Sequence, residues 1–292
     1  DKLTSYNGQT ITYDAIGNPL NDGIWSYEWQ AGRQLKRMSK DGVIVEFKYD
    51  HNGIRTQKTV TANGITTITN YTLHRKLITH IVCGNDNLHF FYDNECNPSK
   101  FSFNQEIYTY ILNVHGDVVG ILDGSGMLVV EYWYDSWGKL LGISGTMAET
   151  VGRQNPLRYR GYSYDEETGL YYLGLRYYNA DVCRFLQADN TACLGVNNRN
   201  FSNNLYQYCN NSPVDHYDPD GSFDIGTFFK GVARAITGAV AVTVGVMVCI
   251  AGAPVTAVIT AGAAITAGVL TVTNGAADIQ QSITDDNFVR DT

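Results

Sequence analysis

The chain has 292 residues, of which 44% are hydrophobic, and a formal charge of −8. This length is enough for a sizeable core. The sequence holds 20 tyrosines and 29 glycines but only 4 methionines, and 12% of its residues are aromatic. A mainly helical chain and a disordered chain are both excluded, because tyrosine favours strands, glycine favours turns and disordered chains contain few aromatics. The acidic balance argues against a broad nucleic-acid-binding surface.

The start of the chain, the cysteines and the histidines limit which kinds of site we expect. The chain begins at Asp1 without a methionine or a signal peptide, so we expect it to be the C-terminal piece of a longer protein. The 6 cysteines lack CxxC spacing, which predicts free thiols rather than a zinc ribbon or a disulfide framework. The 6 histidines lack ligand spacing, and phosphate-binding and dinucleotide-binding motifs are absent. We therefore expect no metal and no cofactor.

A Tyr-Asp dipeptide recurs through the first three-quarters of the chain. A glycine follows the aspartate by three residues in four copies, and Cys96 takes that place after Asp93. The copies begin at Tyr13, Tyr49, Tyr92, Tyr134, Tyr164 and Tyr217. Such self-similarity is typical of a repeat architecture in which neighbouring units stack.

Each unit predicts a strand, a tight turn and a second strand. Residues 45–49 alternate between apolar and polar, which indicates a strand. The Asp50 side chain can accept a downstream backbone N–H, and Gly53 can supply a positive φ angle. A second strand is expected over residues 55–60. Stacked units would form a spiralling antiparallel sheet with aromatic side chains on one face.

These repeats resemble the YD repeats of Rhs proteins, toxin-complex C subunits and teneurins. Residues 156–221 resemble the Rhs-associated core domain, whose motifs follow one another here in the same order. They are RYRGYSYDEETGLYYLGLRYY, then RF and D, then NLYQYCNNSP and DPDG. The resemblance implies a partial β-cocoon around a C-terminal toxin, with the core segment curling inward as a plug. It also implies a secreted or surface polymorphic toxin that acts in competition between cells, with an immunity protein as a possible partner. The acidic charge, in turn, predicts no nucleic-acid partner.

The same resemblance implies an aspartyl autoprotease that acts once on its own chain. Asp189 and Asp218 would be the catalytic pair, Arg176 the supporting cation, and the cut would fall just after the DPxG motif, in the region of Gly221, Ser222 and Phe223. Two close carboxylates share a proton, so one can activate water while the other polarises the carbonyl. From the residues alone, Asp218 could equally be a turn residue before Pro219, and Asp189 a cap. The family usually has leucine in place of Ser222 and glycine in place of Cys183.

The last seventy residues differ sharply in composition. No charged residue lies between Ala235 and Ala277, and Pro254 divides this run into two apolar halves. Each half is long enough for a membrane-spanning helix, and small residues spaced by four favour close helix packing. We expect a helical hairpin over residues 235–274. It could span a membrane, pack as a helical pair inside the shell, or be a β-rich or disordered linker.

These observations predict a mostly β protein with three parts: a YD-repeat shell (1–155), an Rhs-type core (156–222) and a hydrophobic segment with a short acidic tail (223–292). The predicted function is a toxin shell that encloses a C-terminal effector and releases it by self-cleavage. Two alternatives remain open. One is a non-cleaving surface protein that binds glycans or neighbouring cells, for instance through Trp25, Trp29, Trp133 and Trp137. The other is a membrane-active effector that acts through residues 235–274.

Overall fold

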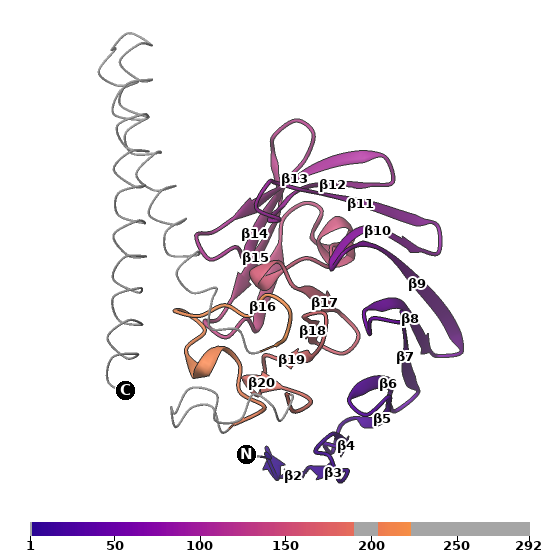
Figure 1. Ribbon diagram of the computed structural model, residues 1–292. Helices are drawn as coiled ribbons and strands as arrows, with labels where there is room; N and C mark the ends of the chain where they lie inside the picture. The colour runs from indigo at the N-terminus through magenta and orange to yellow at the C-terminus, as the bar shows by residue number, and fades with distance from the viewer. Residues whose placement is uncertain (1, 190–203, 223–292) are drawn as a thin grey trace, which may run out of the picture. The chain divides into compact units, whose positions relative to one another are not determined.

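A computed structural model describes residues 2–189 and 204–222, all of which lie in one unit of the chain, Asp1–Ile225. Within them a single antiparallel sheet of 14 strands runs in chain order from β3 to β16 (Figure 1). Its strands are β3 (Thr12–Tyr13), β4 (Pro19–Asn21), β5 (Ser26–Gln30), β6 (Gln34–Lys40), β7 (Val43–Tyr49), β8 (Arg55–Ala62), β9 (Ile65–His74), β10 (Leu77–Cys83), β11 (Asp86–Tyr92), β12 (Pro98–Phe103), β13 (Glu106–Leu112), β14 (Val118–Leu122), β15 (Leu128–Tyr134) and β16 (Leu140–Ser144). The predictions of a mostly β fold and an antiparallel repeat sheet are confirmed.

Two smaller sheets and three short helical turns complete the described residues. They are the hairpin β1 (Ser5–Tyr6) and β2 (Gln9–Thr10), and the sheet β17 (Ser163–Asp165), β18 (Leu170–Tyr172), β19 (Tyr177–Asn179) and β20 (Arg184–Phe185). The helical turns are η1 (Ala148–Gly152), η2 (Tyr159–Gly161) and η5 (Cys209–Asn211). No helix in these described ranges is long and apolar enough to cross a membrane. The expected hairpin at 235–274 lies outside them, and the division into three domains stays a prediction.

One turn chemistry is repeated along the large sheet. At Asp50 the side-chain Oδ1 accepts the backbone N–H of Asn52 at 2.9 Å and of Ile54 at 2.8 Å. Gly53 then adopts φ +80°, as the repeat predicts. The same two bonds recur at Asp14, Asp93, Asn113, Asp123 and Asp135. Cys96 adopts φ +67° at the position of the glycine, which is a strained conformation for a residue with a Cβ. The turns therefore depend on the side-chain oxygen more strictly than on the glycine.

The core segment (residues 156–222) packs against the 14-stranded sheet. This sheet, β3 to β16, is called the shell from here on, and its strands curve around β17–β20 (Figure 1). One apolar cluster joins Met38 and Phe47 of the shell to Leu170, Tyr172 and Tyr177 of the core segment. Burying apolar area is the main favourable contribution to this docking. Tyr49, Tyr92 and Tyr134 of the repeats also pack, partly buried, against the apolar clusters, whereas Tyr217 is 37% exposed.

A buried ion-pair cluster fixes how the core segment sits. Asp165 on β17 is 1% exposed and pairs with Arg55 and, at 3.0 Å, with Lys58, both on β8. The Arg55 guanidinium also lies 4.5 Å from the ring centre of Tyr172 and 4.8 Å from that of Tyr71. Burial would raise the pKa of Asp165, but the two cations outweigh it and lower that pKa. The carboxylate is therefore held in its charged form.

A Gly53→Ala substitution tests the turn. Alanine at φ +80° would lower the free energy of unfolding by about 1 kcal/mol, because its Cβ crowds the following carbonyl in the left-handed region. Gly124→Ala is the control, since a Cβ there meets only an ordinary contact with the Ile107 carbonyl at 3.8 Å. Urea denaturation measures both. Equal losses in the two variants would contradict this account of the turn.

An Asp165→Asn substitution tests the buried cluster. It would lower the free energy of unfolding by about 3 to 5 kcal/mol, because Arg55 and Lys58 would be left buried without their shared carboxylate. Asp181→Asn breaks an exposed shell-to-core ion pair instead, with Lys139, and should change the free energy of unfolding little. A mild effect of Asp165→Asn in the same denaturation experiment would show that the cluster does not hold the core segment.

Candidate autoproteolytic site

Arg176 is a buried cation at the centre of the candidate site. It lies directly before β19, in a tight turn in which the Leu173 N–H donates to the Arg176 carbonyl at 3.0 Å. Its side chain is 6% exposed, and its guanidinium lies 3.6 Å from the ring centre of Phe185. A buried charge needs charged or strongly polar partners, so the neighbours of this guanidinium define the site.

Those neighbours are the residues that the sequence singled out. Nη2 of Arg176 lies 2.9 Å from Oδ2 of Asp189 and 3.4 Å from Oδ2 of Asp218. Nε donates to the carbonyl oxygen of Gly221, and Nη1 donates to that of Leu205 at 3.2 Å. One guanidinium therefore contacts both candidate carboxylates and the carbonyl of the last DPxG residue.

The DPxG motif forms a turn that folds back over Arg176. Oδ1 of Asp218 accepts the Gly221 N–H at 2.8 Å, and the Asp218 carbonyl accepts the Tyr162 hydroxyl at 2.7 Å. Gly221 has φ +76°, and a Cβ there would lie 3.0 Å from the Arg176 backbone nitrogen. Glycine is thus favoured twice, by its conformation and by the close approach to Arg176. Asp218 is a turn residue and a member of the site at once.

Asp218 has a strongly shifted pKa. Burial raises it to about 7, and this effect outweighs Arg176 and the backbone N–H groups of Gly221 and Asp220, which lower it. At neutral pH a substantial fraction of Asp218 therefore carries a proton. Asp189 makes the shorter contact with Arg176. The two carboxylates differ in environment, which is the usual basis for dividing acid and base roles.

Ser222, the residue after the motif, is held by its neighbour. Its N–H donates to Oδ1 of Asp220 at 3.1 Å, and its hydroxyl donates to the same oxygen at 2.5 Å. Phe223 lies outside the described residues. Cys183, which replaces a family glycine, adopts φ +57°, so the expected turn forms in spite of the substitution.

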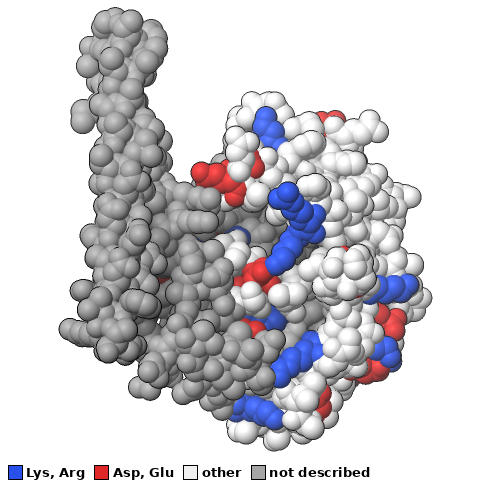
Figure 2. Space-filling view, in the orientation of Figure 1, with Lys and Arg blue, Asp and Glu red and all other residues white. Residues whose placement is uncertain are grey.

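The other candidates from the sequence do not form a site in the described residues. Trp25 is buried and Trp133 is 47% exposed, so the four tryptophans do not present one stacking surface. No group of three metal-ligating side chains occurs in the described ranges, and Cys83, Cys96, Cys183 and Cys209 are free thiols. Figure 2 shows basic and acidic side chains interspersed over the described part of one face.

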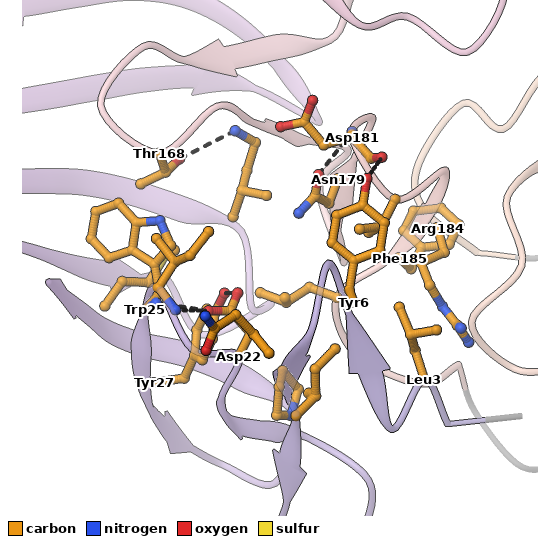
Figure 3. A pocket seen from close by; sticks show the side chains of 18 of the residues that line it. Leu3, Tyr6, Asp22, Trp25, Tyr27, Thr168, Asn179, Asp181, Arg184 and Phe185 are labelled. Carbon is orange, nitrogen blue, oxygen red and sulfur yellow. Dashed lines mark hydrogen bonds between the residues drawn. The ribbon is translucent and has the colours of Figure 1, made fainter.

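A cavity of about 180 Å³ lies between the N-terminal strands and the core segment (Figure 3). Its lining includes Tyr6, Trp25, Leu170 and Phe185. Asp22 also lines the cavity and accepts hydrogen bonds within its own turn, from the backbone N–H of Trp25 at 2.7 Å and from the Tyr27 hydroxyl. The Asp22 carboxylate therefore stabilises this turn, which is a structural role.

The repeat turns, the long antiparallel sheet and the inward core segment together define a YD-repeat shell protein. The chain belongs to the teneurin YD-shell family, whose model matches residues 1–214. This confirms the resemblance to the YD-repeat proteins that the sequence indicates.

Curated relatives include toxins. The chain is 37% identical over 238 residues to the tRNA3(Ser)-specific nuclease WapA of Bacillus spizizenii, covering 76% of this chain and 9% of that protein. It is 34% identical over 127 residues to the double-stranded DNA deaminase toxin A of Burkholderia cenocepacia, covering 40% of this chain and 8% of that protein. The crystal structure of TcdB2-TccC3-Cdc42 matches 76% of this chain and 11% of that chain, with a TM-score of 0.60 and 20% identity, and so shares the fold. The chain thus spans about a tenth of the length of these proteins.

The raised pKa of Asp218 predicts a pH-dependent stability. Both proteins compared would carry Asp189→Asn, which removes the other candidate catalytic carboxylate, and one would also carry Asp218→Asn. The folded pKa of Asp218 is about 7 and the unfolded value is about 3.9, so the folded state favours the protonated carboxyl. Its contribution to stability is therefore complete only at low pH, where the carboxyl is protonated in both states. Relative to the Asp218→Asn protein, stability should fall as the pH rises from about 4 to about 7 and then level off. A difference that stays constant or grows with pH would show that Asp218 is not desolvated.

Proposed function

We propose that this chain is the C-terminal part of a secreted toxin shell. We also propose that its core segment cuts its own backbone between Gly221 and Ser222. The single observation that carries this proposal is the contact of one guanidinium with Asp189, Asp218 and the Gly221 carbonyl. The toxin relatives support the shell role.

Each group at the site has a chemical role in the proposed reaction. Arg176 polarises the Gly221 carbonyl and stabilises the negative charge that develops on its oxygen. Asp189 accepts a proton from a water molecule, which attacks the carbonyl carbon. Asp218, in the fraction of molecules in which it carries a proton, donates that proton to the Ser222 nitrogen as the peptide bond breaks. The products are a carboxyl group at Gly221 and an amine at Ser222.

The reaction needs no substrate pocket. The bond to be cut belongs to the same turn as Asp218, so it is held at high effective concentration. The cut separates residues 222–292 from the shell, and we propose that they form the released segment or its leading part. Contact of residues 235–274 with a target membrane, and neutralisation by an immunity protein, belong to the same proposal.

Incubation of the purified chain tests the proposed cleavage. The intact mass of 32.3 kDa should be replaced by two fragments, and Asp189→Asn and Asp218→Asn should each slow the cut by at least about 100-fold. Asp215→Asn is the matched control, because it removes a carboxylate from the same loop outside the site. The rate should fall as the pH rises through about 7, where Asp218 loses its proton. Fragments that persist in the Asp189→Asn protein would contradict the mechanism.

A further inference from the structure

Two cations of the shell reach the two ends of the candidate site. Lys76 lies in the turn between β9 and β10, and its Nζ lies 2.5 Å from Oδ2 of Asp220 in the DPxG motif. The other oxygen of the same carboxylate accepts both the N–H and the hydroxyl of Ser222. Lys76 thus holds the residue that anchors the Ser222 side of the bond proposed to be cut.

Arg33 holds the other end. It lies in the turn between β5 and β6, and its Nη1 donates to the carbonyls of Ala188, at 2.7 Å, and Asp189. Gln187, which is 1% exposed, reinforces this contact: its Nε2 donates to the Arg33 carbonyl at 3.5 Å and its Oε1 accepts the Tyr177 N–H at 3.1 Å. The Arg33 turn is therefore tied to Asp189 and, through Gln187, to the strand that follows Arg176.

Both contacts join segments far apart in the chain. The groups that would react come from the core segment, whereas the cations come from two separate turns of the shell. A shift of about 1 Å in a reacting group can slow a reaction by about 100-fold, so the placement of Asp189 and of the Ser222 peptide depends on shell turns that have already folded. We propose that Arg33 and Lys76 are positioning residues that make self-cleavage conditional on the folding of these two shell turns. This inference rests on the proposed self-cleavage.

The exposure of Lys76 separates positioning from general stability. Its side chain is 55% exposed, so its pair with Asp220 contributes little to the free energy of unfolding. The chain offers a matched control in Lys139, which pairs with Asp181 of the core segment at 2.8 Å and is 53% exposed. Both pairs join shell to core segment, but only the Lys76 pair touches the candidate site.

The experiment compares self-cleavage rates and melting temperatures of the full chain and its variants. Lys76→Met should slow the cut by about tenfold, Lys76→Arg should restore it to within about twofold, and Lys139→Met should leave it within about twofold of the parent. Raising the ionic strength should slow the parent and leave Lys76→Met unchanged, because salt screens an exposed ion pair. Arg33→Met should slow the cut as well, and its melting temperature shows how much of that loss is unfolding.

The outcomes distinguish the two proposals. A parent chain that stays intact overturns the proposed self-cleavage and this inference with it. A parent that is cut, with Lys76→Met equally fast, overturns the inference alone. Equal slowing by Lys76→Met and Lys139→Met also overturns it, because the effect would then come from docking of the core segment in general. Slowing by Lys76→Met alone, with an unchanged melting temperature, supports it.

Discussion

The structure depends on one buried carboxylate. Asp165 sits between the shell and the core segment, and its charge is balanced by Arg55 and Lys58 from a single strand. A carboxylate without such partners would be costly to bury, so the core segment docks in the one position that supplies both cations. In this position, Tyr172 and Tyr177 of the core segment pack in an apolar cluster with residues of the shell. Arg176 lies directly before Tyr177, so its position follows from the same contact.

A second buried charge organises the site by the same rule. Arg176 collects two carboxylates and two backbone carbonyls, because these are the groups that a desolvated guanidinium requires. The same burial raises the pKa of Asp218 to about 7. The contacts that stabilise the buried Arg176 also bring together the proposed base Asp189, the proposed acid Asp218 and the Gly221 carbonyl. The shell cations Arg33 and Lys76 complete the site from outside the core segment.

Much of this could be predicted from the sequence, and the reason differs by element. The repeat turns are local, so an aspartate followed three residues later by glycine predicts them. Asp123 forms the same turn without a preceding tyrosine, and a Tyr-Asp pattern therefore misses it. The grouping of Arg176, Asp189 and Asp218 followed from resemblance, and the structure brings these residues together. The roles of Arg55, Arg33 and Lys76 could not be predicted, because their partners lie more than a hundred residues away and depend on how the sheet curves.

The most direct test of the account is the mass of the N-terminal fragment formed when the chain is incubated in water enriched in oxygen-18. If water attacks the Gly221 carbonyl that Arg176 holds, that fragment ends at Gly221 and gains one heavy oxygen in its new carboxyl group. The partner fragment then begins at Ser222 and gains none. A fragment that ends at another residue, or a chain that stays whole, would contradict the central claim that Arg176 assembles a self-cleaving site.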